Sequence, residues 1–114
     1  MLSSHQAERL RQQLNPDHTA LPMIFAALAD RSRYQIFQLL IKKHDICVTD
    51  VANILGISVP AASQQLRILE TAGLINRERR GQMICYSVKA RDPLVKSLMR
   101  IMASFNNAAH LKYR

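Results

Sequence analysis

Apolar residues recur every three or four positions along most of this chain, and this spacing predicts a mainly helical fold. A narrow apolar stripe runs through residues 4–14, and a longer one runs through residues 92–112. Between them, we expect one helix to follow the capping residue Thr19 and another to follow Asp30. The expected buried faces are Ile24, Phe25, Leu28 and Ala29 in the first of these helices, and Ile36, Phe37, Leu40 and Ile41 in the second.

Residues 49–73 have the pattern of two short helices joined by a tight turn. Thr49 is expected to cap the first helix, and Gly56 is placed to end it in the left-handed conformation. Ser58 is expected to cap the second helix, which ends at Gly73. This arrangement predicts a helix-turn-helix, whose second helix enters the DNA major groove in proteins that read DNA. An ordinary pair of packed helices is the structural alternative.

Residues 75–88 form two β-prone arms around a polar Arg-Arg-Gly-Gln tip, which predicts a β-hairpin. The surrounding segment, residues 74–91, contains five Lys and Arg residues and one Glu. A basic hairpin directly after a helix-turn-helix is typical of a wing that lies on the phosphate backbone. In a winged helix, we expect a short strand at 46–48 to pair with the second strand of the hairpin, near residues 83–88.

Charge and composition narrow the class of protein. The 114 residues are 48% hydrophobic, and the formal net charge is +8. This length fits one domain over residues 1–114, and this charge favours a polyanionic partner. No apolar stretch is long enough for a transmembrane helix, and the amino terminus lacks a signal-peptide pattern, so we expect a cytoplasmic protein without a membrane partner. No catalytic constellation or cofactor motif stands out, so we expect neither an enzyme nor a cofactor.

The terminal helices contain more apolar surface than a small domain needs. We expect residues 4–14 and 92–112 to form a two-fold dimer interface, although packing on the domain's own core is the alternative. The stripe on the last helix contains Leu94, Leu98, Ile101, Met102 and Phe105, and Ala108 and Ala109 prolong it.

Polar residues on the second helix of the 49–73 unit and on the hairpin are the candidate DNA contacts. Hydroxyl, amide and guanidinium groups both bind phosphates and read base edges. The candidates are Ser58, Ser63, Gln64, Gln65 and Arg67 on the helix, and Arg77, Arg79, Arg80 and Gln82 on the hairpin. A module that docks another protein and never reads DNA is the competing function, but it does not require a basic hairpin.

Several motifs in order resemble the ArsR/SmtB family of winged-helix repressors, from residue 24 to residue 105. The resemblance implies a mainly α winged helix-turn-helix with a small β-hairpin. It also implies a homodimeric repressor that binds an inverted repeat in double-stranded DNA and releases it when an inducer binds. The motifs are FAALADRSR at 25–33, ICVTDV at 46–51, SVPAASQQLR at 58–67, LETAGLI at 69–75, and RRGQ at 79–82 running into Tyr86.

The ligand patterns of the family's two metal-sensing sites are incomplete in this chain. The Cys-Val-Cys pattern of one site reads Cys47-Val48-Thr49 here, so one thiolate is missing. The other site needs paired ligands on the last helix, where this chain has only Asp92 and His110. We therefore expect the classical metal sites to be absent, and the sequence leaves the inducer open.

Three hypotheses remain for Cys47 and Cys85. They are two separate buried apolar side chains, or a redox or persulfide pair whose oxidation loosens DNA binding, or Cys47 belongs to a metal site with His44. The redox hypothesis requires the two sulfurs to be neighbours across the strands expected at 46–48 and 83–88. The metal hypothesis requires a further ligand from His5, His18 or His110.

Overall fold

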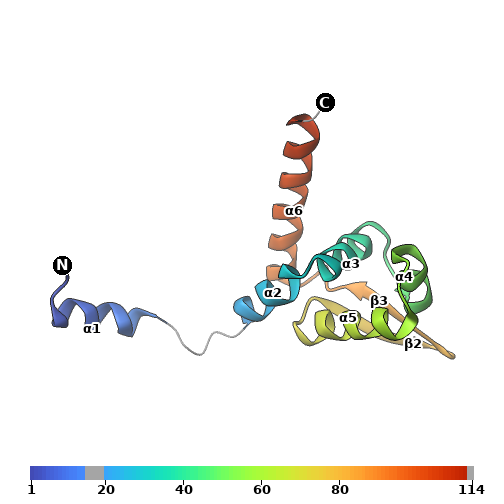
Figure 1. The fold of residues 1–114 in the computed structure, drawn as a ribbon, viewed down its shortest axis with the longest axis horizontal. Helices are drawn as coiled ribbons and strands as arrows, with labels where there is room; N and C mark the ends of the chain where they lie inside the picture. Colours follow the sequence, from blue (N-terminus) through green and yellow to red (C-terminus); the bar gives the residue numbers. More distant parts are fainter. Residues whose placement is uncertain (15–19, 113–114) are drawn as a thin grey trace.

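The computed structural model describes residues 1–14 and 20–112, with side chains through residue 106. Six helices and three strands occupy these residues (Figure 1). In chain order they are α1 (Ser4–Gln13), α2 (Ala20–Ala29), α3 (Arg31–Lys42), β1 (Ile46–Cys47), α4 (Val48–Leu55), α5 (Val59–Thr71), β2 (Ile75–Arg80), β3 (Met83–Val88) and α6 (Pro93–Lys112).

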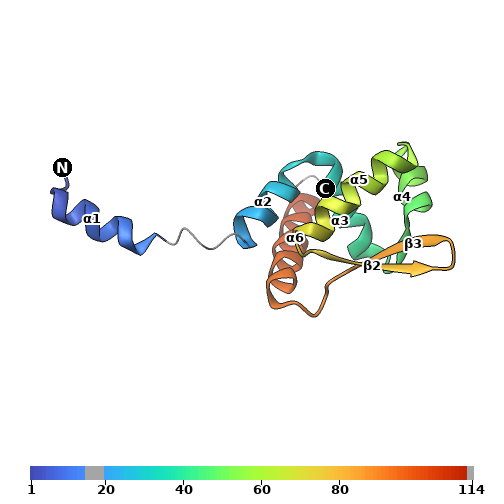
Figure 2. The same ribbon diagram turned by 90° about the horizontal axis from the view of Figure 1, so that it is seen from below.

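The three strands form one small antiparallel sheet in the order β1-β3-β2. The predicted hairpin is therefore formed by β2 and β3, and β1 pairs with the outer side of β3. Gly81 has a φ of 61° at the tip, a conformation that glycine adopts without steric cost. Figure 2 shows the hairpin extending beyond the helices, with α4 and α5 beside it.

The hydrophobic core lies between α3, α4, α5, the sheet and the first part of α6. Phe37, Ile36 and Leu40 of α3 are completely buried at its centre. They pack in one cluster with residues from every other element of the body, including Val51, Leu66, Leu69, Ile75 and Tyr86. The helical spacing predicted Ile36, Phe37 and Leu40 in this cluster, because α3 buries one continuous face.

The helix ends follow the expected chemistry in three places and differ in a fourth. Asp30 accepts a hydrogen bond from the backbone N–H of Arg33, and Ser58 accepts one from Ala61, so both predicted caps are confirmed. Gly56 ends α4 with a φ of 65°, as predicted. The prediction that Thr49 caps α4 is wrong, because the helix begins two residues earlier than predicted, at Val48 directly after β1, with Cys47 at the capping position. Thr19, the other predicted cap, lies outside the described residues.

The helix α2 leaves much of its expected apolar face exposed. Ile24 and Ala27 are its buried residues, and Leu28 is half-buried. Phe25 is 59% exposed and Ala29 is also exposed, contrary to prediction. Only one narrow face of α2 is therefore buried against the core.

The helix α6 also buries only part of its predicted stripe. Leu98 and Met102 are buried together with Val95, which was not predicted. Ile101 and Phe105 are 53% and 71% exposed, and Leu94 is half-buried. The side chains of Ala108 and Ala109, which were expected to prolong the stripe, lie outside the described part of the chain.

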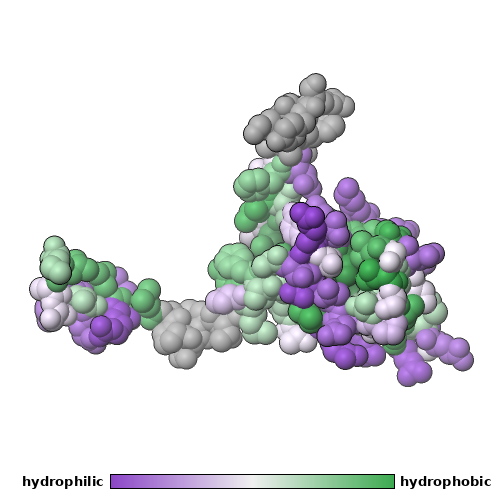
Figure 3. Space-filling view, viewed as in Figure 1, coloured by the Kyte–Doolittle hydropathy of each residue, from purple (hydrophilic) through white to green (hydrophobic). Residues whose placement is uncertain are grey.

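This exposed apolar surface is continuous in appearance from α6 to α2 (Figure 3). The helix α6 rises away from the sheet, and α1 lies apart from the helical body (Figure 1). No residue of α1 is buried, and Leu10 and the capping residue Leu14 that follows the helix are exposed. Apolar side chains on three helices therefore lack a covering surface within the described part of one chain.

Candidate nucleic-acid interface

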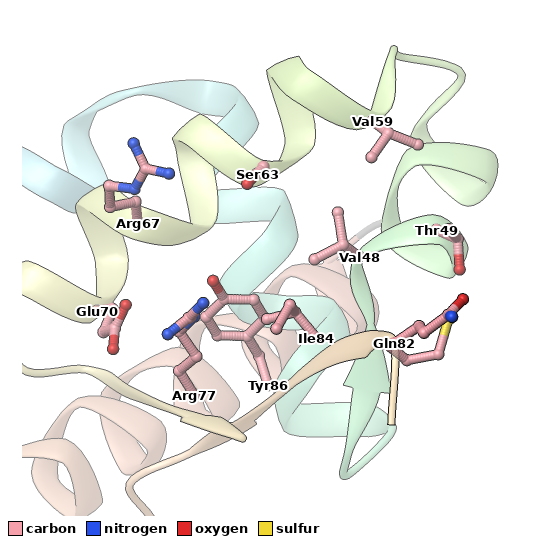
Figure 4. Close-up of a pocket in the computed structure, with 11 residues that line it drawn as sticks. Val48, Thr49, Val59, Ser63, Arg67, Glu70, Arg77, Gln82, Ile84 and Tyr86 are labelled. Carbon is pink, nitrogen blue, oxygen red and sulfur yellow. The ribbon is translucent and has the colours of Figure 1, made fainter. Parts of the chain in front are cut away.

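The second helix of the helix-turn-helix, α5, and the hairpin line opposite sides of one groove of about 480 Å³ (Figure 4). Arg77, Ile84 and Tyr86 project from the sheet toward α5 in this view. The amino-terminal end of α4 closes one end of the groove through Val48 and Thr49. Four of the sequence-predicted contacts therefore line one groove, and they are Ser63, Arg67, Arg77 and Gln82.

The other predicted residues of α5 lie in different surroundings. Gln64 is exposed, so its amide is accessible to a partner. Ser58 is exposed as well, but its hydroxyl already accepts the N–H of Ala61 at 3.2 Å. Gln65 is half-buried, and its Oε1 accepts a hydrogen bond from Nη1 of Arg33 at 3.0 Å. The sequence pattern did not predict this contact, because Arg33 lies on another helix.

The hairpin presents three exposed arginines, which differ in their local contacts. Arg79 donates from Nε to the carbonyl oxygen of Gly81 at 3.0 Å, so it is held against the tip. Arg80 forms an ion pair with Asp45 and a second one, of 3.3 Å, with Glu78. Arg77 forms no ion pair with any residue that the structure describes.

The two carboxylates stabilise the charged form of Arg80. Its hydrogen bond to Asp45 and then that to Glu78 raise the pKa of Arg80 above the usual value for arginine. The folded and unfolded pKa values both lie far above neutral pH, so Arg80 stays charged throughout the neutral range. Its electrostatic effect on a polyanion is therefore constant with pH, but Asp45 and Glu78 oppose it.

Three polar residues of the groove were missed by the sequence reasoning. Glu70 lies one helical turn after Arg67, a spacing that puts both side chains on one side of α5. Its carboxylate adds a negative charge to a groove that also contains Arg67 and Arg77. Thr49 and Tyr86 also line the groove, and only Glu70 had a recognisable signal in the helical spacing.

Cys47 and Cys85 lie directly opposite each other in the pairing of β1 with β3, and a disulfide joins them. Their Cα atoms are 3.8 Å apart. The hypothesis of two separate buried side chains is therefore wrong, because the two residues are bonded and Cys47 is only half-buried. The neighbouring pair required by the redox hypothesis is present. Cys85 is completely buried, whereas Cys47 is half-buried at the amino-terminal end of α4.

The metal hypothesis gains no further ligand from the described residues. No group of three or more His, Cys, Asp or Glu side chains that could hold a metal ion occurs among them. His18 lies outside the described residues, and nothing is described for the side chain of His110. Within the same described part of the chain, no helix is both long and apolar enough to cross a membrane.

Comparisons with known proteins agree with this architecture. Residues 30–77 match the model of the family described as bacterial regulatory protein, arsR family. A cadmium resistance transcriptional regulatory protein CadC homolog from Staphylococcus aureus is 37% identical over 67% of this chain and 61% of its own length. The transcriptional repressor SdpR of Bacillus subtilis is 40% identical over 57% of this chain and 71% of its own length.

The fold also matches a solved structure, the homodimeric winged helix-turn-helix DNA-binding domain Mb0332 from Mycobacterium bovis. Its TM-score is 0.69 at 24% identity, covering 99% of this chain and 94% of that one. This likeness establishes the winged helix-turn-helix fold.

The chain spans 61% of the length of the Staphylococcus relative, so the match does not show that this chain has the full activity of that protein. The family consists of transcriptional regulators and is not a class of enzymes. On its matched helix-turn-helix and its sequence relatives, this chain belongs to the ArsR family of bacterial regulatory proteins.

Proposed function

We propose that this protein is a transcriptional repressor that binds an inverted-repeat operator in double-stranded DNA. The groove between α5 and the hairpin carries this proposal, because it combines a helix with polar side chains and a basic hairpin. The net charge of +8 supports a polyanionic partner. The repressor name of the Bacillus relative supports the same activity. No catalytic activity is proposed.

The candidate contacts have two roles in this proposal. Gln64 and Arg67 read base edges in the major groove, with Ser63 beside them, and Ser58 contacts a phosphate at the start of α5. Arg77, Arg79, Arg80 and Gln82 lie along the backbone or in the minor groove. We leave Gln65 out of the contact set, because Arg33 already occupies its amide oxygen.

Fluorescence anisotropy of the reduced protein on a duplex from its own upstream region tests the proposal, with a scrambled duplex as control. We expect tighter binding to the upstream duplex and a steep fall of affinity with salt. Equal and weak binding to both duplexes contradicts the proposal. That outcome favours the alternative, a winged-helix module that docks a protein partner.

We further propose that residues 1–114 act as one winged-helix unit that forms a two-fold dimer through α1 and α6. The exposed apolar residues Leu10, Ile101 and Phe105 support this, because a second copy can cover them. Phe25 extends the same interface onto α2. The solved relative from Mycobacterium bovis is itself homodimeric. Light scattering across a concentration series tests the assembly, and a monomer at every concentration contradicts it.

We propose that the cysteine pair senses an oxidant and thereby controls DNA binding. In the cytoplasm, where we propose that this regulator acts, cysteines are kept reduced, so Cys47 and Cys85 are thiols at rest. Cys47 is the more accessible sulfur, and the thiolate is the nucleophilic form of a cysteine. We propose that this thiolate attacks a peroxide, which forms a sulfenic acid and releases one water or alcohol.

The Cys85 thiolate then attacks the sulfenic sulfur, the disulfide forms, and the sulfenic oxygen leaves as water. Two thiols are oxidised by two electrons, and the peroxide is reduced. The cross-link fixes the hairpin to the start of α4, so the hairpin cannot adjust to the duplex and DNA is released. We expect the oxidised protein to bind the upstream duplex at least about tenfold more weakly than the reduced protein.

A matched variant isolates the cysteine chemistry. Cys47→Ser should bind DNA like the reduced protein, both with and without hydrogen peroxide, because it cannot form the cross-link. Equal affinities of the oxidised and reduced wild-type protein contradict this regulation and leave the repressor proposal intact.

A further inference from the structure

Arg33 connects three helices through one side chain. It lies in the first turn of α3, where its Nε donates to the carbonyl oxygen of Ala27 at 2.7 Å. Its Nη2 reaches the carbonyl oxygen of Ala26 at 3.5 Å, so two groups near the carboxyl end of α2 accept from it. Its Nη1 donates to Oε1 of Gln65 in the middle of α5 at 3.0 Å. A planar guanidinium can make these contacts at the same time, because its donors point in fixed directions.

The contact with Gln65 fixes the helix that faces the proposed DNA. Gln65 is half-buried, whereas its neighbour Gln64 is exposed. Successive residues of a helix are about 100° apart around its axis, so anchoring one of them sets the direction of the other. A rotation or slide of α5 that breaks the Arg33 contact therefore redirects Gln64 and Arg67.

Charge and burial add to this anchor. The positive guanidinium lies at the carboxyl end of α2, where the helix dipole favours a cation. Arg33 is itself half-buried, and it lines an apolar pocket with Met23, Ile68 and Ala72, between α2 and α5. Water competes less effectively for a hydrogen bond in such surroundings than on an open surface. The contacts of Arg33 with Ala27 and Gln65 are therefore less exposed to water than the ion pairs of the hairpin.

We propose that Arg33 is a positioning residue for sequence-specific DNA binding, which acts by holding α5 in its reading orientation through Gln65. This inference rests on the proposed repressor function. The same side chain links α5 to α2, whose exposed Phe25 belongs to the surface that a second copy covers in our proposal. Arg33 thereby connects the dimer surface with the helix that reads DNA.

A double-mutant cycle between Arg33→Lys and Gln65→Ala tests the connection. Lysine keeps the charge but is a point donor, so it cannot hold α2 and α5 together. We expect each single variant to lose about tenfold in affinity for the upstream duplex, roughly the effect of one hydrogen bond to a charged group. Affinity for the scrambled duplex should change less than about twofold. The double variant should be no weaker than either single variant.

Arg31→Lys is the matched control, since Arg31 is an exposed neighbour in the same helical turn. It should leave both affinities unchanged. Gln65→Glu distinguishes positioning from direct contact. A glutamate still accepts from Arg33, so binding should stay within about threefold of wild type. If Gln65 itself touched DNA, the added negative charge would weaken binding more than Gln65→Ala does.

Three results overturn the inference. The first is a double-mutant cycle in which the two losses simply add, and the second is an equal loss on the upstream and scrambled duplexes. Melting temperatures of all variants are measured in parallel, and an affinity loss that follows the melting temperature also overturns it, because it indicates a purely structural role. Failure of the repressor proposal looks different, since the wild-type protein itself then fails to discriminate between the two duplexes.

Discussion

The carboxylate of Asp45 forms an ion pair with the guanidinium of Arg80, so an acidic residue just before β1 holds an arginine at the end of β2. Asp45 has a φ of 67°, in the left-handed region that asparagine also tolerates. The positive charge of a proposed phosphate contact is thus already paired with a carboxylate of the same chain.

Asp45→Asn should release Arg80 while keeping the backbone conformation. We expect affinity for both the upstream and the scrambled duplex to rise roughly twofold, since surface ion pairs are weak. Anisotropy titrations across salt measure this change. Asp50→Asn removes the same charge from an exposed position on α4 and should have a smaller effect. Equal effects of the two variants would show that only the net charge matters.

Arg79→Ala should weaken binding to every duplex by a similar factor. Arg79 is exposed near the tip of the hairpin, and a phosphate contact carries no sequence information. The slope of log affinity against log salt concentration should become shallower by about 0.9 for each phosphate that the protein no longer neutralises. An unchanged slope would remove Arg79 from the residues that bind the DNA backbone.

Gln64→Ala, unlike Arg79→Ala, should weaken binding to the upstream duplex only. Gln64 is an exposed amide on the outer face of α5, so we expect it to read a base edge. Affinity for the upstream duplex should fall about tenfold, and affinity for the scrambled duplex should stay nearly constant. Competition titrations with both duplexes measure the ratio. Equal losses on the two duplexes would exclude a reading role.

Reduction of the Cys47–Cys85 disulfide should lower the melting temperature. The two cysteines are 38 positions apart in sequence. The chain-entropy model gives a closed loop of this length about 4 kcal/mol of free energy of unfolding. In a domain of this size, we expect a decrease of at least about 10 °C. Circular dichroism melts with and without a reductant measure it, and Cys85→Ala should show no response to the reductant.

Phe105→Glu should disrupt the proposed dimer. Phe105 is exposed on α6, and a charge cannot be buried against a second apolar surface without a large cost. Light scattering should report a monomer for this variant at concentrations where the wild-type protein is dimeric. Ile54→Glu is the control, because Ile54 is an exposed apolar residue on α4. If both variants remain dimeric, the interface lies elsewhere.

The sequence predicted the local features of this protein well. The caps at Asp30 and Ser58 depend on residues three positions apart, and the left-handed end at Gly56 depends on one residue, so all three can be recognised in the sequence. The hairpin was predicted for the same reason, since its arms are close in sequence.

Features that depend on distant packing were missed. The helix α2 is apolar on nearly every side, so its pattern could not show that Ile24 faces the core while Phe25 faces outward. The contact of Arg33 with Gln65 joins residues 32 positions apart. The cysteine pair was an intermediate case. The strand pairing was expected, but a shift of one residue in register would have separated the two sulfurs.

The position of β2 at the edge of the sheet has a consequence for solubility. An edge strand exposes unpaired N–H and C=O groups, to which a strand from another molecule can add. Five of the six residues of β2 are exposed, and four of these five are charged. The same arginines that we propose to contact phosphates therefore protect this edge against aggregation. Replacing several of them with β-branched apolar residues would yield a protein that precipitates, and its loss of DNA binding would then say nothing about recognition.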